Sequence, residues 1–322
     1  MSSCTSRPIP RRDMTAQNIV DECGEESNVK NAHILVTGAT SGIGIETGRS
    51  LALAGAKVYL MGRNEKKIEE VSESINKDLQ AKSSAGSIEG ALCDLNSLVS
   101  IKQFAEKFIR EKKPLNILIL NAGVFNFNFA QTVDGLEEVI GVNHIGHAYL
   151  TQLLMPALLE NAPSRIVVVS SNLHHGPPVN YQALERMSSA DAHAKKGWGA
   201  MRSYQQSKLA NVLFARALTA HYNNKQVTAY SLHPGVIDTN LTRNVPSILA
   251  TVSKIFFRKK TPEQGAATTV FCALKAGLEK ESGKYFDDST VTNEADKWTD
   301  DDINTFWEWT EKIIRERTGS LS

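Results

Sequence analysis

Short runs of apolar residues, rich in β-branched side chains, alternate along this chain with longer stretches in which apolar residues recur every three or four positions. The runs occupy residues 33–37, 57–61, 87–93, 115–120, 165–170 and 227–232. Continuous runs of this length are typical of strands that are buried on both faces. Helical spacing is visible in residues 64–81, 98–111, 201–218, 262–276 and 301–317. We therefore expect strands to alternate with amphipathic helices.

Strands that alternate with helices form a parallel sheet, because each helix returns the chain to the edge at which the next strand starts. We predict an α/β fold with a doubly wound parallel sheet, the Rossmann fold. The sequence has no internal repeat and no linker rich in Pro, Gly or Ser, which favours a single domain. We expect residues 32–322 to form this domain and the polar residues 1–31 to form a disordered tail.

The segment TGATSGIG, residues 37–44, lies between the first expected strand and the next helix. Glycines let the backbone come close to a diphosphate, and a helix start offers free N–H groups with a partial positive charge. The glycine spacing differs from G-x-G-x-x-G, so a simple tight turn is the alternative. The residues expected to hold the diphosphate are Gly38, Thr40, Ser41, Gly42, Ile43 and Gly44.

The end of the second expected strand, YLMGRN, indicates which dinucleotide binds. An Asp or Glu at this point suits the ribose 2′-hydroxyl of NAD, whereas an Arg suits the 2′-phosphate of NADP. This chain has Gly62 followed by Arg63, whose guanidinium can grip a phosphate with two hydrogen bonds. We predict NADP (NADPH) as the cofactor. The alternative is that Arg63 is a solvated surface charge.

Tyr204 and Lys208 lie four positions apart in a helical stretch and therefore share one helix face. A tyrosine with an ordinary pKa of about 10 is a poor proton shuttle at neutral pH, and a nearby ammonium group favours the phenolate. We expect Lys208, together with a cationic nicotinamide, to lower the pKa of Tyr204. Pairs with this spacing also occur by chance, so the pair alone does not establish catalysis.

Six motifs occur in a fixed order along the chain: TGATSGIG, NAG (121–123), GVNHIGH (141–147), VVSS (168–171), YQQSK (204–208) and HPG (233–235). Together they resemble the short-chain dehydrogenase/reductase family over about residues 31–287. Segments such as VNHIGHAYLTQLL and QGAATTVFCAL resemble its retinol-dehydrogenase-like and WW-domain-containing oxidoreductase branch. We see no WW-domain pattern ahead of the first expected strand.

The resemblance implies a catalytic tetrad of Asn143, Ser171, Tyr204 and Lys208. Tyr204 would be the general acid in reduction and, as phenolate, the base in oxidation. Lys208 would lower the pKa of Tyr204 and hold the nicotinamide ribose. Ser171 would bind the substrate oxygen, and Asn143 would hold a water that connects Lys208 to solvent.

The resemblance also implies the remaining cofactor contacts. Asp94 matches the acid that bonds the adenine amino group, and Asn121 matches a residue beside the adenosine. The other residues expected at the cofactor are Tyr204, Lys208, Pro234 and Gly235.

Composition narrows the class of protein. The chain has a net charge of +1, with 41% hydrophobic and 22% charged residues, so nothing in its charge favours nucleic acid. The four cysteines share no metal-ligand spacing and indicate reduced thiols. No apolar window is long enough for a transmembrane helix, and the N-terminal segment lacks the apolar core of a secretion signal. We expect a cytoplasmic protein.

Some features leave two interpretations open. The histidine pairs His144/His147 and His174/His175 complete no zinc motif, so we predict structural histidines and no metal site. The apolar positions from Leu241 to Phe256 suit a substrate lid or a core helix equally. The long segment between Ser171 and Tyr204 is expected to border the substrate pocket. The Trp-rich segment 302–316 is expected to be a docked amphipathic helix rather than a partner surface.

The sequence thus predicts an NADP(H)-dependent oxidoreductase that moves hydride between nicotinamide and a carbonyl or alcohol. The branch resemblance favours a small apolar substrate, namely a retinoid, steroid or lipid aldehyde or ketone. The resemblance implies a dimer or a tetramer, paired through two helices of which one carries Tyr204, and a homodimer is the simplest such assembly. The alternatives are a catalytically weak cofactor-binding scaffold and a signalling protein.

Overall fold

Eight strands form one sheet in the order β3-β2-β1-β4-β5-β6-β7-β8. The computed structural model describes residues 9–23, 29–176, 179–181, 184, 199–237 and 259–319. Strands β1 to β7 pair in parallel, and β8 is antiparallel to β7. The strands are β1 His33–Thr37, β2 Lys57–Gly62, β3 Ser87–Leu92, β4 Ile117–Leu120, β5 Ser164–Val169, β6 Val227–His233, β7 Tyr285–Asp287 and β8 Thr290–Thr292. The prediction of a doubly wound α/β fold is confirmed.

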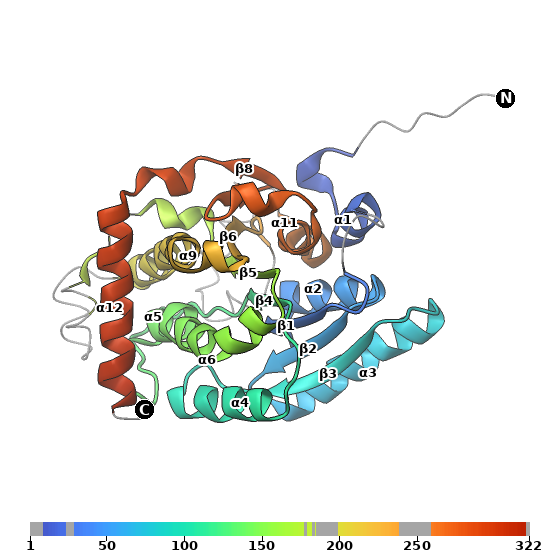
Figure 1. The fold of residues 1–322 in the computed structure, drawn as a ribbon, viewed down its shortest axis with the longest axis horizontal. Helices are drawn as coiled ribbons and strands as arrows, with labels where there is room; N and C mark the ends of the chain where they lie inside the picture. The colour runs from blue at the N-terminus through green and yellow to red at the C-terminus, as the bar shows by residue number, and fades with distance from the viewer. Residues whose placement is uncertain are drawn as a thin grey trace.

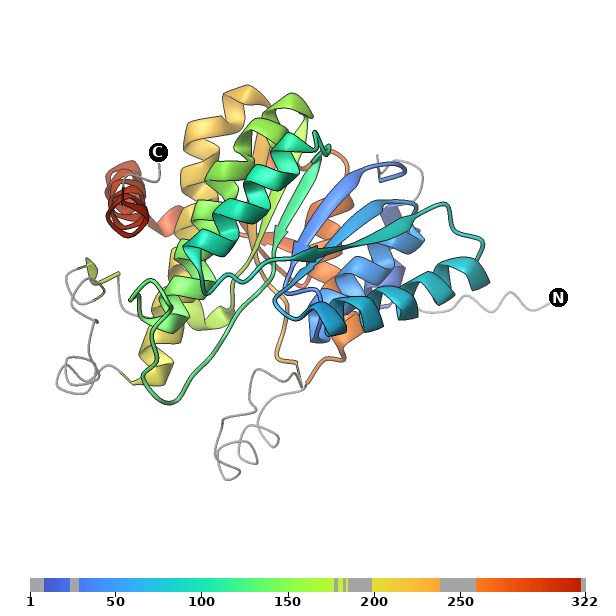
Figure 2. The ribbon, with the colours of Figure 1, turned by 90° about the horizontal axis from the view of Figure 1, so that it is seen from below.

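Helices cover both faces of the sheet (Figures 1 and 2). One face carries α2 (Gly42–Leu53), α3 (Glu65–Ala81) and α11 (Pro262–Leu274). The other carries α4 (Leu98–Arg110), α6 (Gly146–Glu160) and α9 (Ala200–Tyr222). The remaining helices and turns are η1 Arg11–Asp13, α1 Ala16–Cys23, α5 Glu138–Ile140, η3 Gly141–Ile145, η4 Asn172–His175, η5 Asn223–Lys225, η7 Leu278–Glu281, η8 Glu294–Lys297 and α12 Asp300–Thr318.

The strand residues alternate between two apolar cores, one on each face of the sheet. In β1, Leu35 packs into the core beneath α4, α6 and α9, while Ile34 and Val36 pack into the core beneath α2, α3 and α11. Side chains of a strand alternate in direction, so burial of both faces requires apolar residues at every position. This is why the strands were recognisable as continuous apolar runs.

Strand β8 was not predicted. It is joined to β7 by a two-residue turn at Asp288 and Ser289, which have φ angles of 46° and 57°. Two successive residues with positive φ give the hairpin turn whose twist suits antiparallel strands. The usual residues for such a turn are Asn-Gly or Asp-Gly, and Asp-Ser carries only part of that signal.

Helix α12 packs along α9 and reaches α6 through a hydrogen bond from Gln152 to Glu311. It begins with a capping box in which Thr299 and Asp302 bond each other's backbone N–H groups. The expected docking of this Trp-rich segment is therefore observed. Helix α12 thus covers part of α9, and the homodimer remains a prediction.

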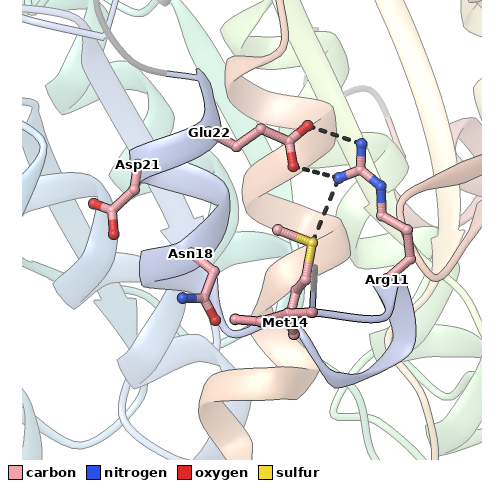
Figure 3. A pocket seen from close by; sticks show the side chains of 6 residues that line it. Arg11, Met14, Asn18, Asp21 and Glu22 are labelled. Carbon is pink, nitrogen blue, oxygen red and sulfur yellow. Dashed lines mark hydrogen bonds and ion pairs between the residues drawn. The ribbon is translucent and has the colours of Figure 1, made fainter. Parts of the chain in front are cut away.

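The N-terminal segment differs from the expected disordered tail. Residues Ala16–Cys23 form helix α1, and its residues Ala16, Ile19 and Cys23 are buried in the core beneath α11. Figure 3 shows the outer side of this contact, where the guanidinium of Arg11 forms two hydrogen bonds with the Glu22 carboxylate at 2.6 and 2.8 Å. Arg11 also lies over the Phe271 ring of α11 at 5.5 Å. The buried side of α1 has only one large apolar residue, Ile19, so the sequence pattern does not indicate a helix. Packing against α11 stabilises this segment as a helix.

Within the described residues, no helix is both long enough and apolar enough to span a lipid bilayer.

We predict that Ile19→Ala lowers the free energy of unfolding by about 2–4 kcal/mol, because the change leaves a cavity between α1 and α11. Urea denaturation followed by circular dichroism measures the effect. Asp21→Ala, on the exposed side of the same helix, is the matched control. A loss of less than about 0.5 kcal/mol in Ile19→Ala would show that α1 does not contribute to the core.

Candidate active site

The predicted site residues meet at one edge of the sheet, because each follows the carboxyl end of a parallel strand or lies on a helix beside it. The order of strands reverses between β1 and β4, and a crevice at such a point is where doubly wound folds bind ligands. In strand order the contributing segments are the glycine loop after β1, Arg63 after β2, Asp94 after β3, Asn121 after β4, Ser171 after β5, and Pro234 with Gly235 after β6.

Two glycines of the loop are required by backbone contacts. Gly38 has a φ of +65°, and a Cβ there would lie 2.8 Å from the Cα of Ala122. A Cβ on Gly44 would lie 2.3 Å from the carbonyl oxygen of Gly38. No side chain fits at these distances, so the loop lies directly against the segment that follows β4.

The start of α2 suits an anion. The remaining loop residues, Thr40 and Ser41, lead into the helix, whose first residues are Gly42 and Ile43. Ser41 is the N-cap residue, but its side chain makes no capping hydrogen bond. The N–H of Gly44 bonds to the carbonyl oxygen of Ser41 at 3.2 Å. The N–H groups of Gly42 and Ile43 ahead of it have no partner within the helix and are available to a phosphate. Gly42 has a φ of +50°, which glycine adopts without strain.

The hydroxyl of Thr37, at the end of β1, connects three segments. It accepts hydrogen bonds from the backbone N–H groups of Asn121 and Ala122, at 2.9 and 3.0 Å. It lies 2.9 Å from Nε2 of His147, whose Nδ1 is 3.1 Å from the carbonyl oxygen of Asn143. A carbonyl can only accept, so Nδ1 carries the proton and Nε2 accepts from Thr37. Burial lowers the pKa of His147 to about 4, which keeps this neutral tautomer.

Asn143 lies in a π-helical turn, Gly141–Ile145, between α5 and α6. Such turns are rare and occur frequently at functional sites. The side-chain oxygen accepts from Val124 N at 2.7 Å, and the side-chain nitrogen donates to Val124 O and to Ser207 Oγ, each at 3.0 Å. Asn143 therefore joins the segment after β4 to α9.

Lys208 is buried against β5. Its Nζ donates to the carbonyl oxygen of Val169 at 3.1 Å and lies 5.5 Å from the centre of the Tyr204 ring. Ser170 Oγ donates to the backbone oxygen of Lys208 at 2.6 Å, which fixes α9 against the end of β5. Burial lowers the pKa of Lys208 to about 8.

The Ser171 hydroxyl lies close enough to Tyr204 to lower its pKa, whereas the neighbouring Ser170 donates to the backbone of α9. Burial outweighs this effect and raises the pKa of Tyr204 to about 12. The lowered pKa expected from Lys208 and a bound nicotinamide stays a prediction, because burial by itself disfavours the phenolate.

The two residues expected at the adenosine end differ in exposure. Arg63 is exposed, and among the described residues it forms no ion pair or hydrogen bond. Asp94 is half-buried, and its carboxylate accepts from the N–H of Asn96 at 3.0 Å. A Cβ on Gly62 would lie 2.7 Å from Cγ2 of Thr40, so a larger side chain at the end of β2 requires the Thr40 side chain to move.

Gly235 has a φ of +96°, and a Cβ on it would lie 2.4 Å from Cδ of Lys260. A bridge between Ile237 and Lys260 holds together the two ends of the segment that follows. The predicted lid, from Leu241 to Phe256, lies outside the described residues, as does most of the insertion between Ser171 and Tyr204.

The other histidine singled out in the π-turn is packed in the core. His144 is fully buried among the rings of Phe214, Phe306 and Trp309, and its Nε2 is 3.0 Å from the hydroxyl of Thr310 on α12. Burial lowers its pKa to about 3, so the ring is neutral. This agrees with the structural role expected for His144 and His147.

Three supporting contacts were not predicted: Thr37 with His147, Asn143 with Ser207, and His174 Nδ1 with the carbonyl oxygen of Ser171 at 2.7 Å. The first two join residues far apart in the sequence, and no local pattern indicates them. The adjacency of Ser171 and His174 was visible, but the direction of the imidazole ring was not.

Comparison with known proteins is consistent with this geometry. A family model for short chain dehydrogenases matches residues 32–183. The WW domain-containing oxidoreductase of Homo sapiens is 38% identical over 98% of this chain and 76% of that protein. Retinol dehydrogenase 11 of Homo sapiens is 41% identical over 80% of this chain and 77% of that protein.

A solved structure from Beutenbergia cavernae, described as an NAD(P)-dependent gluconate 5-dehydrogenase with NADP bound at low occupancy, superposes with a TM-score of 0.65. It is 25% identical and covers 82% of this chain and 97% of that chain. The identities to curated relatives and the extent of their coverage go beyond a likeness of fold. The chain therefore belongs to the short-chain dehydrogenase/reductase family of oxidoreductases, in its retinol-dehydrogenase-like branch.

Proposed function

We propose that this protein is an NADP(H)-dependent oxidoreductase that transfers hydride between nicotinamide and a carbonyl or alcohol of an apolar substrate. The observation that carries the proposal is the burial of Tyr204 and Lys208 on one face of α9, with Lys208 Nζ 5.5 Å from the centre of the Tyr204 ring and with the Ser171 hydroxyl close enough to lower the pKa of Tyr204. This group of side chains lies at the same sheet edge as the uncapped start of α2.

The residues present fit a dinucleotide. The uncapped N–H groups of α2 suit a diphosphate, and a Cβ at Gly38 or Gly44 would push the loop away from the segment after β4. Arg63 is exposed and can bind a 2′-phosphate, and Gly62 offers no carboxylate to a free 2′-hydroxyl. These features support NADP over NAD. When bound, the cofactor supplies or accepts the hydride.

The side chains of the site would donate and accept the proton that accompanies the hydride. The raised pKa of Tyr204 keeps it a phenol at neutral pH, ready to donate a proton to an oxygen that gains charge. Ser171 is placed to donate a hydrogen bond to the same oxygen. Lys208, with a pKa of about 8, can lose and regain a proton near neutral pH, and Asn143 holds α9 and the segment after β4 in place around it.

Apolar side chains around Tyr204 support an apolar substrate. The Phe125 ring contacts the rings of both Tyr204 and Phe127 edge to face, at 5.4 and 5.3 Å between centres. Phe127 and Leu173, the latter two positions after Ser171, remain 36% and 37% exposed. Exposed apolar groups beside a polar catalytic group suit a ligand with a hydrophobic body and one carbonyl. Two relatives are named retinol dehydrogenases, which favours the retinoid, steroid and lipid aldehyde or ketone class.

One observation favours a second candidate, a catalytically weak cofactor-binding scaffold. A tyrosine with a pKa of about 12 is a weaker proton donor than one near neutral pH. Under this hypothesis the protein binds NADPH tightly and turns over no carbonyl.

We predict that Tyr204→Phe lowers kcat by about 10²–10⁴-fold, because the substitution removes the proton donor and leaves the ring in place. The assay follows NADPH consumption with retinaldehydes, steroid ketones and lipid aldehydes. Tyr222→Phe, at the far end of the same helix, is the control. Equal turnover in Tyr204→Phe would contradict the mechanism, and tight NADPH binding without turnover in the wild type would support the scaffold.

We predict that Arg63→Gln raises the KM for NADPH by about 10–100-fold, since a charge-assisted hydrogen bond to the 2′-phosphate is lost. The KM for NADH should change little. Lys66→Gln, an exposed neighbour on α3, controls for the general loss of positive charge. An equal effect of Arg63→Gln on both cofactors would argue against a 2′-phosphate contact.

Burial of the Lys208 ammonium has a cost in stability. The difference between its pKa of about 8 and the ordinary value of 10.5 corresponds to about 3 kcal/mol in favour of the unfolded state. The cost is complete below pH 8, shrinks as the pH rises, and disappears above pH 10.5, where Lys208 is neutral in both states. If the amine of Lys208 is removed, the carbonyl oxygen of Val169 still accepts a hydrogen bond from Asn211 Nδ2 at 3.1 Å.

We therefore predict that Lys208→Met abolishes activity and raises the free energy of unfolding at pH 7 by about 2 kcal/mol, after allowing about 1 kcal/mol for the lost hydrogen bond. Urea denaturation at several pH values should show the gain shrinking between pH 8 and 10.5. Lys77→Met, an exposed position on α3, is the control. A gain that is absent at pH 7, or that grows with pH, would contradict the assigned burial cost.

A further inference from the structure

Two histidines and a glutamate from separate parts of the chain converge beside Ser171. His174 and His175 lie on η4, directly after Ser171, and Glu294 begins η8. Their ligand atoms, one from each residue, all lie within 4.8 Å of one another. Nε2 of His174 is 3.8 Å and Nδ1 of His175 is 3.3 Å from the same carboxylate oxygen of Glu294.

The hydrogen bonds of His174 fix which nitrogen faces Glu294. Its Nδ1 lies 2.7 Å from the carbonyl oxygen of Ser171, and because a carbonyl only accepts, Nδ1 carries the proton. In the neutral ring Nε2 then presents a lone pair. The side chain is 4% exposed, and Nε2 has no hydrogen-bond partner among the described residues.

A lone pair that faces a carboxylate is unfavourable unless a positive charge lies between them. The approach of His175 Nδ1 to the same oxygen adds a second nitrogen to the same point. Two imidazole nitrogens and one carboxylate oxygen form a donor set that zinc prefers.

The distances also suit an ion of this kind. In a tetrahedral zinc site with bonds of about 2.0–2.1 Å, ligand atoms lie about 3.3–3.4 Å apart. The separations from Glu294 are 3.3 and 3.8 Å, and all three ligand atoms lie within 4.8 Å of one another, so the side chains must move closer by up to about 1.5 Å to surround an ion. The bond from His174 Nδ1–H to a backbone carbonyl is the contact that commonly orients a metal-bound histidine.

We propose that His174, His175 and Glu294 bind a divalent cation of the zinc class, with a fourth coordination position left to a small ligand. The ion would link η4, which carries the chain away from Ser171, to η8. His175 is half exposed and Glu294 is 28% exposed in its side chain, so the ion can enter from solvent. The proposal differs from the expectation of no metal site, because Glu294 is remote in sequence and completes no recognised motif.

Lys297 competes for the same carboxylate, since it forms an ion pair with Glu294 within η8. This competition gives the proposal an opposite-sign test. Removal of Glu294 should weaken zinc binding, whereas removal of the Lys297 charge should strengthen it.

The test uses the full chain without a histidine tag, freed of metal with a chelator and then equilibrated with zinc chloride. Equilibrium dialysis with elemental analysis measures the bound zinc. We expect one zinc per chain in the wild type, at least about tenfold weaker binding in His175→Gln and Glu294→Gln, and about twofold to fivefold tighter binding in Lys297→Gln. Cobalt in place of zinc should give the visible absorption of a four-coordinate site.

The matched controls are His221→Gln and Glu308→Gln, exposed residues of the same types outside the cluster, which should bind zinc as the wild type does. Circular dichroism confirms that each variant is folded. No saturable zinc binding by the wild type would overturn the proposal and leave a protonated imidazole opposite Glu294. Full binding retained in His175→Gln and Glu294→Gln, or no tightening in Lys297→Gln, would show that the assigned ligands are wrong.

Discussion

The hydroxyl of Thr37 is the contact on which the arrangement of the site depends. It accepts hydrogen bonds from two backbone N–H groups of the segment after β4 and donates a hydrogen bond to His147, which in turn donates one to the carbonyl oxygen of Asn143. One hydroxyl thus fixes the positions of the glycine loop, the segment after β4 and the π-turn relative to one another. All of these partners are buried or half-buried, so a change in any of them would leave a polar group without a partner.

The same packing explains why the site is costly to maintain. Lys208 and Tyr204 are buried on α9, and burial shifts the pKa of each in the direction that favours the neutral form. A buried ammonium group opposes folding, yet position 208 holds a lysine. Such a conflict between stability and chemistry is typical of functional sites.

Most of the architecture was predictable because it rests on local patterns. Strands buried on both faces must be apolar throughout, and the sheet edge that carries the site follows from parallel strands. The glycines were also predictable, although the structure gives Gly38 and Gly44 a further reason, the contact with Ala122 and Asn121. Helix α1 and strand β8 were missed because each is short and owes its conformation to the surface or turn that it meets.

Local patterns were enough to predict the fold class, the order of the motifs and the residue types at the site, since these depend on periodicity and on neighbours in the chain. Tertiary packing was needed to establish which tautomer His147 adopts and that Glu294 lies opposite His174 and His175. Burial, which no local pattern shows, also raises the pKa of Tyr204. These outcomes depend on burial and on contacts between remote segments, and a linear pattern of residues carries neither.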